Sequence, residues 1–170
     1  SWGGSTIAGA LTAPIVGPYA LVEAGTQAIE LRVNGAAALT ESHTLAAGAD
    51  YTLVALGTVA VPSLAWVADD NRLPSNTARA KVRLVHGDAS LGALTLSVDY
   101  AVAASDVVAG SASSFAALAG NDSARLDVSS ASSSDAVYTA TEVNLQAQGV
   151  YTLFVLGGNA APTGVLRKDR

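Results

Sequence analysis

The 170-residue sequence contains no cysteine and no methionine. Disulfide bridges, thiolate catalysis and cysteine metal sites are therefore excluded. Charged residues are also scarce, at 14% of the chain against roughly 25% in typical soluble domains. The two histidines, His43 and His86, are isolated from each other in sequence and make a poor zinc site. We therefore expect a non-enzymatic protein with no catalytic residues, cofactor or metal.

Positive charge and long apolar runs are missing as well. The formal net charge is −5, and basic residues cluster only in the last four positions, 167–170. Binding to nucleic acid needs a positive stripe that releases counterions, so nucleic acid is not an expected partner. No apolar run reaches the roughly 18 residues that cross a bilayer, so we expect no membrane-spanning segment. The abundance of Ser, Thr, Ala and Gly instead favours an extracellular or cell-surface bacterial protein.

The sequence repeats itself at a spacing of 100 residues. The segment LAAGADYTLVALG at 45–57 is similar to LQAQGVYTLFVLG at 145–157. Farther towards the N-terminus the spacing shortens, because the Ser-rich stretch at 129–137 is longer than its counterpart at 34–39. Length changes of this kind belong in hairpin tips.

The repeat predicts two related domains, residues 1–72 and residues 78–170. Asn, Pro and Ser punctuate the segment 69–77 between them, as is typical of a linker. A cluster of three oxygen-bearing side chains, Asp69 to Asn71, lies in this segment and is interpreted as a solvated linker, since calcium needs six to eight oxygen ligands.

The hydrophobic pattern inside each half has a period of two. In residues 80–86, Val82 and Leu84 alternate with Lys81 and Arg83. This alternation predicts strands with one buried face and one wet face. The runs at 51–57 and 151–157 are apolar throughout and predict central strands covered on both faces. With turn signals between these segments and no helical pattern, the sequence predicts an all-β fold of two tandem immunoglobulin-like antiparallel β-sandwich domains.

When the two halves are aligned, the first half lacks the counterparts of two strands of the second. Residues 78–100 predict two strands, but Ser1 aligns with Ser97, so the first domain lacks their counterparts. Burial of one aliphatic side chain is worth roughly 1.5–3 kcal/mol. The missing counterparts of five inward-facing residues amount to about 7–15 kcal/mol, close to the roughly 5–15 kcal/mol that stabilises a whole domain. These five are Val82, Leu84, Leu94, Leu96 and Val98.

Three explanations for the short first half remain open. The sequence is a truncated piece of a longer chain, or a neighbouring subunit fills the groove by β-strand addition, as in donor-strand pilus assembly. In the third, the first domain is rearranged, with residues 5–16 relocated, and needs no extra strands.

The motifs of the second half resemble a known family. The segment KVRLVHGDASLGALTLSVDY at 81–100, the later G-x-YTL-x-x-LG and a closing return strand are similar to the bacterial domain of unknown function 4397 family. Residues 19–33 match the hairpin of that family, whereas residues 86–99 lack its usual prolines. The resemblance implies an all-β extracellular module of immunoglobulin-like type, often present as tandem copies in secreted or lipid-anchored proteins. It implies no known activity.

Trp2, Trp66 and Tyr100 are the candidate ligand or interface residues, because a flat aromatic ring can cover the face of a sugar. Trp66 aligns with Leu166, which favours packing in a core or between domains. His86 ends a strand before Gly87 and Asp88, and in the family that it resembles such a ring can bond the backbone of the turn.

Two functions are consistent with these features. The first is a non-enzymatic extracellular structural protein that self-associates into a surface filament, layer or matrix by β-strand complementation between subunits. The alternative is a secreted or cell-surface binding module for a glycan or protein ligand. The expected partners are accordingly other copies of the chain or a cell-surface glycan.

Overall fold

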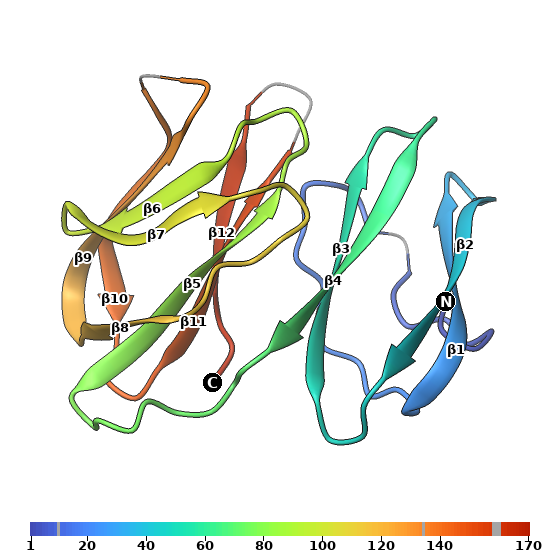
Figure 1. Ribbon diagram of the computed structural model, residues 1–170, viewed down its shortest axis with the longest axis horizontal. Helices are drawn as coiled ribbons and strands as arrows, with labels where there is room; N and C mark the ends of the chain where they lie inside the picture. Colours follow the sequence, from blue (N-terminus) through green and yellow to red (C-terminus); the bar gives the residue numbers. More distant parts are fainter. Residues whose placement is uncertain (10, 134, 158–160) are drawn as a thin grey trace.

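The structure, a computed structural model, describes residues 1–9, 11–133, 135–157 and 161–170. Every regular element in these ranges is a β-strand, and the strands form four sheets that stack side by side (Figure 1). The all-β fold predicted from the alternating pattern is confirmed, and no helix occurs in the described ranges.

The C-terminal part is a sandwich of two four-stranded sheets. Leu84, Leu96, Leu126 and Leu153 are fully buried between them and form the centre of the main core. All ladders in the two sheets are antiparallel except that of β5 with β11, which is parallel. The first sheet has the order β10 (Ala136–Leu145), β9 (Asn121–Ser130), β6 (Leu94–Val98) and β7 (Ala101–Val107), and the second β12 (Thr163–Lys168), β11 (Val150–Leu156), β5 (Arg79–Gly87) and β8 (Ala116–Ala119).

The N-terminal part contributes two hairpins rather than a second full sandwich. They are β1 (Gly25–Val33) with β2 (Ala36–Leu45), and β3 (Asp50–Gly57) with β4 (Pro62–Asp69).

The β3–β4 hairpin lies between the sandwich and the β1–β2 hairpin and uses both of its faces (Figure 1). On one face Val54 and Val67 pack against Val85 and Phe154 of the sandwich. The opposite face packs in a third cluster, in which Leu53, Leu64 and Trp66 surround buried residues outside the hairpin, namely Trp2, Ile29 and Leu45.

The polar face predicted to be wet on β5 is in fact covered. Arg83 is only 2% exposed, and Val85 on the same face is fully buried. The prediction was wrong here because the β3–β4 hairpin packs over this face of the sheet. A two-residue alternation reports the pleat of a strand, but it cannot report a neighbouring layer of the same chain.

Residues 1–5 form a tight turn beside β1. Trp2 and Ser5 exchange two backbone hydrogen bonds of 2.8 and 2.9 Å across Gly3 and Gly4, whose φ angles are 53° and 84°. Two successive positive φ angles are the signature of a type I′ hairpin turn. The turn between β6 and β7 has the same feature, with φ angles of 48° at Asp99 and 67° at Tyr100.

The first arm of this turn runs along one edge of β1. Glu30 N–H donates to the Ser1 carbonyl at 3.1 Å, and Gly3 N–H donates to the Ala28 carbonyl at 2.9 Å. In the sandwich, Asp99 N–H donates to the Arg125 carbonyl of β9 in a corresponding position, at 2.9 Å. Residues 1–3 therefore lie against β1 as the end of β6 lies against β9.

The strand β3 is covered on both faces but is not a central strand among the described residues. Its only ladder is with β4, whereas β11, with a nearly identical sequence, pairs with both β12 and β5. Burial follows this difference: all residues from Val150 to Val155 are buried, but in β3 only Val54 is.

The remaining N-terminal segment runs from residue 6 to residue 24 without a strand, and Ala10 lies outside the described residues. Ile7 and Val16 pack against the clusters on either side of β3–β4, but Ile15 is half exposed and Leu21 fully exposed. Residues 5–16 thus do not rebuild a strand of the first domain within their described part.

The predicted domain boundary coincides with a break between elements. β4 ends at Asp69 and β5 begins at Arg79. The division into residues 1–72 and 78–170 stays a prediction. The Ser-rich stretch at 129–137 contains the tip between β9 and β10, and its Ser134 lies outside the described residues.

Candidate functional site

The fold brings two of the three candidate aromatic residues together. The Trp2 and Trp66 rings meet edge to face, with centroids 5.8 Å apart, and His43 stacks on Trp66 at 4.2 Å. Trp2 is 4% exposed, and its Nε1 donates to the Glu23 carbonyl at 3.1 Å. Trp2 therefore holds the two N-terminal hairpins together, and it has no free ring face to offer a sugar.

Tyr100 lies apart from the two tryptophans, in the turn between β6 and β7. It is 80% exposed, and the Arg125 guanidinium lies 5.5 Å from its ring centroid. None of the aromatic contacts within the described ranges joins it to Trp2 or Trp66. The structure therefore does not bring the three candidate aromatic residues together at one site.

His86 is a fully buried residue near the end of β5, next to the turn that follows the strand. Its Nε2 lies 3.1 Å from the Gly92 carbonyl, and Asp88 N–H donates to its Nδ1 at 3.3 Å. These partners fit the neutral ring with its proton on Nε2. Burial lowers the pKa of His86 below its ordinary value. The nearby Ser90 hydroxyl donates to Asp88 at 2.6 Å.

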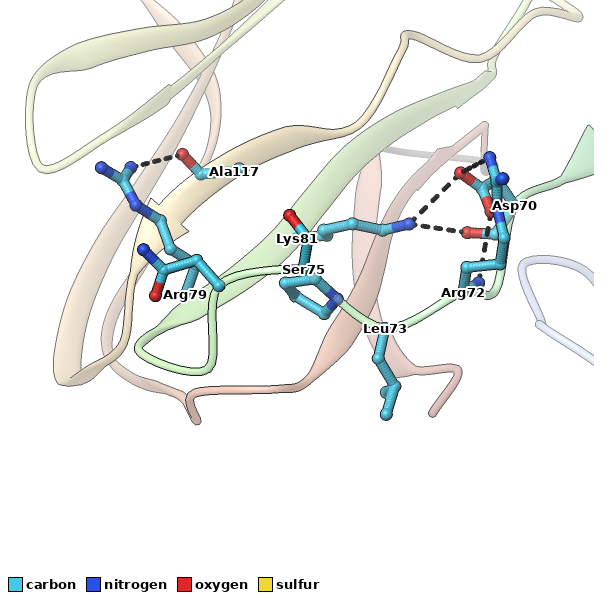
Figure 2. Close-up of a pocket in the computed structure, with 9 residues that line it drawn as sticks. Asp70, Arg72, Leu73, Ser75, Arg79, Lys81 and Ala117 are labelled. Atoms are coloured by element: carbon cyan, nitrogen blue, oxygen red, sulfur yellow. Dashed lines mark hydrogen bonds and ion pairs between the residues drawn. The ribbon is translucent and has the colours of Figure 1, made fainter.

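A hollow of about 410 Å³ lies along the segment that joins β4 to β5 (Figure 2). Three charged side chains in the hollow are paired: the Asp70 carboxylate accepts hydrogen bonds from Arg72 Nε at 2.6 Å and from Lys81 Nζ at 3.4 Å. Arg72 holds the pKa of Asp70 well below its usual range. Arg79 points away from this pair and donates to the Ala117 carbonyl at 3.0 Å (Figure 2).

The most buried charges of the described chain lie between β3–β4 and the sandwich. We call this group the interlayer polar cluster, and its centre is Arg83 on β5. Arg83 Nη2 donates to Asp69 at 2.5 Å, and Arg83 Nε donates to Thr152 Oγ1 at 2.9 Å. The cluster consists of Tyr19, Thr52, Asp69, Arg83, Thr152 and Asp169.

Two Thr–Asp pairs face each other across this cluster. Thr52 donates to Asp69 at 2.8 Å, and Thr152 donates to Asp169 at 2.6 Å. The Tyr19 hydroxyl lies between them, 3.4 Å from Asp69 and 3.5 Å from Asp169. Equivalent residues of the two sequence repeats therefore meet at one place. There the face of β3–β4 that carries Val54 packs against the face of β11–β12 that carries Phe154.

The two carboxylates of the cluster differ in how closely an arginine approaches them. The Asp69 side chain is 0% exposed and binds Arg83 directly, whereas the Asp169 side chain, 1% exposed, lies 3.9 Å from the nearest guanidinium atom, Arg167 Nε. Burial raises the pKa of Asp169 above its ordinary value. A buried charge is costly when no cation binds it directly, so the ionised form of Asp169 is less well stabilised than that of Asp69.

This cluster corrects the interpretation of Asp69 as part of a solvated linker. Its side chain is buried because Arg83 reaches it across the layers. The sequence did hold a signal, since a Thr precedes an Asp by 17 residues in both repeats, at 52 and 69 and at 152 and 169. Among the described residues, no three His, Asp or Glu side chains converge as a metal site.

A family model described as Domain of unknown function (DUF4397) matches residues 2–97. No curated protein matches the chain. In the part of the chain that the structure describes, no helix has the length and apolar character needed to cross a membrane. Because the matched region covers more than half of the sequence, the chain belongs to the DUF4397 family.

Proposed function

We propose that the protein is a non-enzymatic, extracellular structural subunit that associates with copies of itself through the open edge of β3. In this proposal residues 1–72 and 78–170 are two copies of one unit, and the first copy is completed by a strand from a neighbouring subunit. The assembly would be a surface filament, layer or matrix.

The observation that carries the proposal is the difference between β3 and β11. The two strands have nearly the same sequence, but among the described residues β11 has neighbours on both edges and β3 on one. An unpaired edge presents N–H and C=O groups that pair readily with another chain. Within β3 only Val54 is buried, in line with a strand that has lost one neighbour.

The comparison of the turns at residues 3–4 and 99–100 supports the same proposal. Each has two successive positive φ angles, and each is followed along the chain by the corresponding hairpins. Trp2 would then stand at the end of a strand equivalent to β6, and the strand equivalent to β5 would belong beside β3.

The test is the oligomeric state of an edge-blocked variant. Thr58 and Val61 exchange backbone hydrogen bonds at the tip of β3–β4. Bonded and non-bonded pairs alternate along an antiparallel ladder, so the N–H of Ala55, opposite Leu64, points to the free edge. Ala55→Pro removes that donor without removing a bond to β4. Ala55→Val, which copies Val155, is the control.

Light scattering during size-exclusion chromatography should show an oligomer for the original chain and for Ala55→Val. It should show a monomer with an unchanged circular dichroism spectrum for Ala55→Pro. A stable monomer of the original chain at about 100 μM, well above the micromolar range of moderate affinities, would refute the proposal.

The glycan-binding alternative has less support. It needs an exposed aromatic platform, but Trp2 is buried against Trp66, and His43 covers Trp66 from another side. Tyr100 is the one candidate ring that is largely exposed, and it lies in a separate turn.

A further inference from the structure

Only one of the two buried carboxylates of the interlayer polar cluster has a guanidinium at hydrogen-bond distance, since Arg83 lies 2.5 Å from Asp69 but Arg167 lies 3.9 Å from Asp169. Arg83 lies opposite Thr152 in the parallel ladder of β5 with β11. From this position it bonds Thr152 of its own neighbour strand and Asp69 of the other hairpin. A strand that lies beside the Thr–Asp pair of one half thus sends its arginine to the aspartate of the other half.

The same relation can be applied to the open edge of β3. β3 and β11 correspond residue by residue, so Thr52 takes the place of Thr152 and Asp169 takes the place of Asp69. An arginine opposite Thr52 on an added parallel strand would therefore bond Thr52 and reach across to Asp169. That is the buried carboxylate whose nearest guanidinium atom is 3.9 Å away.

Tyr19 is the aromatic residue that would contact the arginine of an added strand, as Phe115 contacts Arg83 in the sandwich. In the sandwich, Phe115 precedes β8, and Arg83 lies 4.7 Å from the centroid of its ring. Tyr19, which aligns with Phe115, has a guanidinium at 4.6 Å, but that group is Arg167, which also donates to the Gly17 carbonyl. Residues 20–23, the counterparts of β8, include the fully exposed Leu21.

The apolar neighbours of the arginine follow from the same register. Val82 and Leu84 flank Arg83 on β5 and lie opposite Tyr151 and Leu153. On the added strand, the equivalent residues would lie opposite Tyr51 and Leu53, which face the cluster around Trp2.

We propose that the open edge of β3 accepts a parallel strand donated by another subunit, in which an arginine between two aliphatic residues lies opposite Thr52 and pairs with Asp169. This inference rests on the proposed function and adds to it the register and the side chain that select the donated strand. The donated strand would resemble β5 in sequence. Its arginine would give Asp169 a direct guanidinium contact, as Arg83 gives Asp69.

A peptide with the sequence of residues 77–88, TARAKVRLVHGD, is the probe. It is labelled with a fluorophore, and its binding to the protein is followed by fluorescence anisotropy. The Ala55→Pro variant, whose β3 edge is blocked, is the negative control. A peptide with Arg83→Gln removes the proposed contact. A peptide with Arg79→Gln is the matched control, because β11 pairs with β5 only from Lys81 onwards and the control arginine falls outside that register.

The unaltered peptide and the Arg79→Gln peptide should bind and should dissociate the oligomer. The Arg83→Gln peptide should bind about 10- to 100-fold more weakly, as expected for loss of a hydrogen bond between charged groups. In a double-mutant cycle with Asp169→Asn protein, the difference in affinity between the two peptides that differ at Arg83 should shrink, because the contact with Thr52 remains while the charge of Asp169 is lost.

Equal binding of the Arg83→Gln and Arg79→Gln peptides would overturn the assignment of the arginine and leave strand addition at β3 standing. Failure of every peptide to bind, with oligomers that persist, would overturn the assignment of a parallel strand at β3. A chain that is monomeric without peptide refutes the proposed function instead.

Discussion

Replacement of Arg83 by Met should destabilise the protein strongly, because it leaves a buried carboxylate without its cation. The Arg83 and Asp69 side chains are 2% and 0% exposed and lie 2.5 Å apart. Removal of one partner from a buried ion pair typically costs about 3–5 kcal/mol. Thr52 still donates to Asp69 at 2.8 Å, so we expect a loss near the lower end, about 3 kcal/mol.

The exposed pair of Arg125 and Asp127 is the matched control. Its atoms are 2.6 Å apart, close to the distance in the buried pair, but its side chains are 36% and 21% exposed. Pairs of this kind contribute roughly 0–1 kcal/mol, so Arg125→Met should have little effect. The contrast between the two substitutions isolates burial, since both remove an arginine from a short ion pair.

Urea unfolding followed by circular dichroism and by tryptophan fluorescence measures both variants, with equal m values as the condition for comparison. Adding Asp69→Asn to Arg83→Met should recover a large part of the loss, because the charge disappears while an acceptor for Thr52 remains. If Arg83→Met and Arg125→Met shift the midpoint equally, the interlayer polar cluster is not the buried, dry contact described above.

Three further outcomes follow from the same structure. Trp2→Ala should cost about 3–5 kcal/mol, as is typical when a buried aromatic side chain is removed, while Tyr100→Ala, at an 80% exposed site, should stay within about 0.5 kcal/mol in the same unfolding assay. The pKa of His86 is lowered in the folded protein from 6.5, so the unfolded chain binds the proton more readily. The contribution of His86 to stability should be complete above pH 6.5 and fall as the pH falls below it, and His86→Gln should flatten that part of the curve of unfolding free energy against pH. The pKa of Asp169 is raised, so its carboxylate opposes folding increasingly as the pH rises above 3.8, and Asp169→Asn should raise stability at pH 7 relative to pH 4 when the two proteins are compared in urea.

The strand content could be predicted from the sequence because alternation of side chains is a local property. The pattern at 80–86 gives β5, and the continuous apolar runs give β3 and β11, each close to its observed bounds. The duplicated YTL motif predicts two similar strands, and β3 and β11 are both strands in the structure.

The polar contacts could not be predicted in the same way, because they join residues far apart in the chain. Arg83 looks like an ordinary exposed strand residue until the β3–β4 hairpin covers it, and Asp69 looks like a linker residue until Arg83 reaches it. The role of Trp2 depends on the turn at Gly3 and Gly4, which places its ring against Trp66. Layer packing decides all three, and no period in the sequence records it.

A high-resolution structure of the assembled protein would show what occupies the free edge of β3. We expect a strand from a neighbouring subunit parallel to β3 along Asp50–Gly57, with an arginine opposite Thr52 at hydrogen-bond distance from Asp169. An assembly in which this edge of β3 faces solvent, with the subunits joined elsewhere, would contradict it.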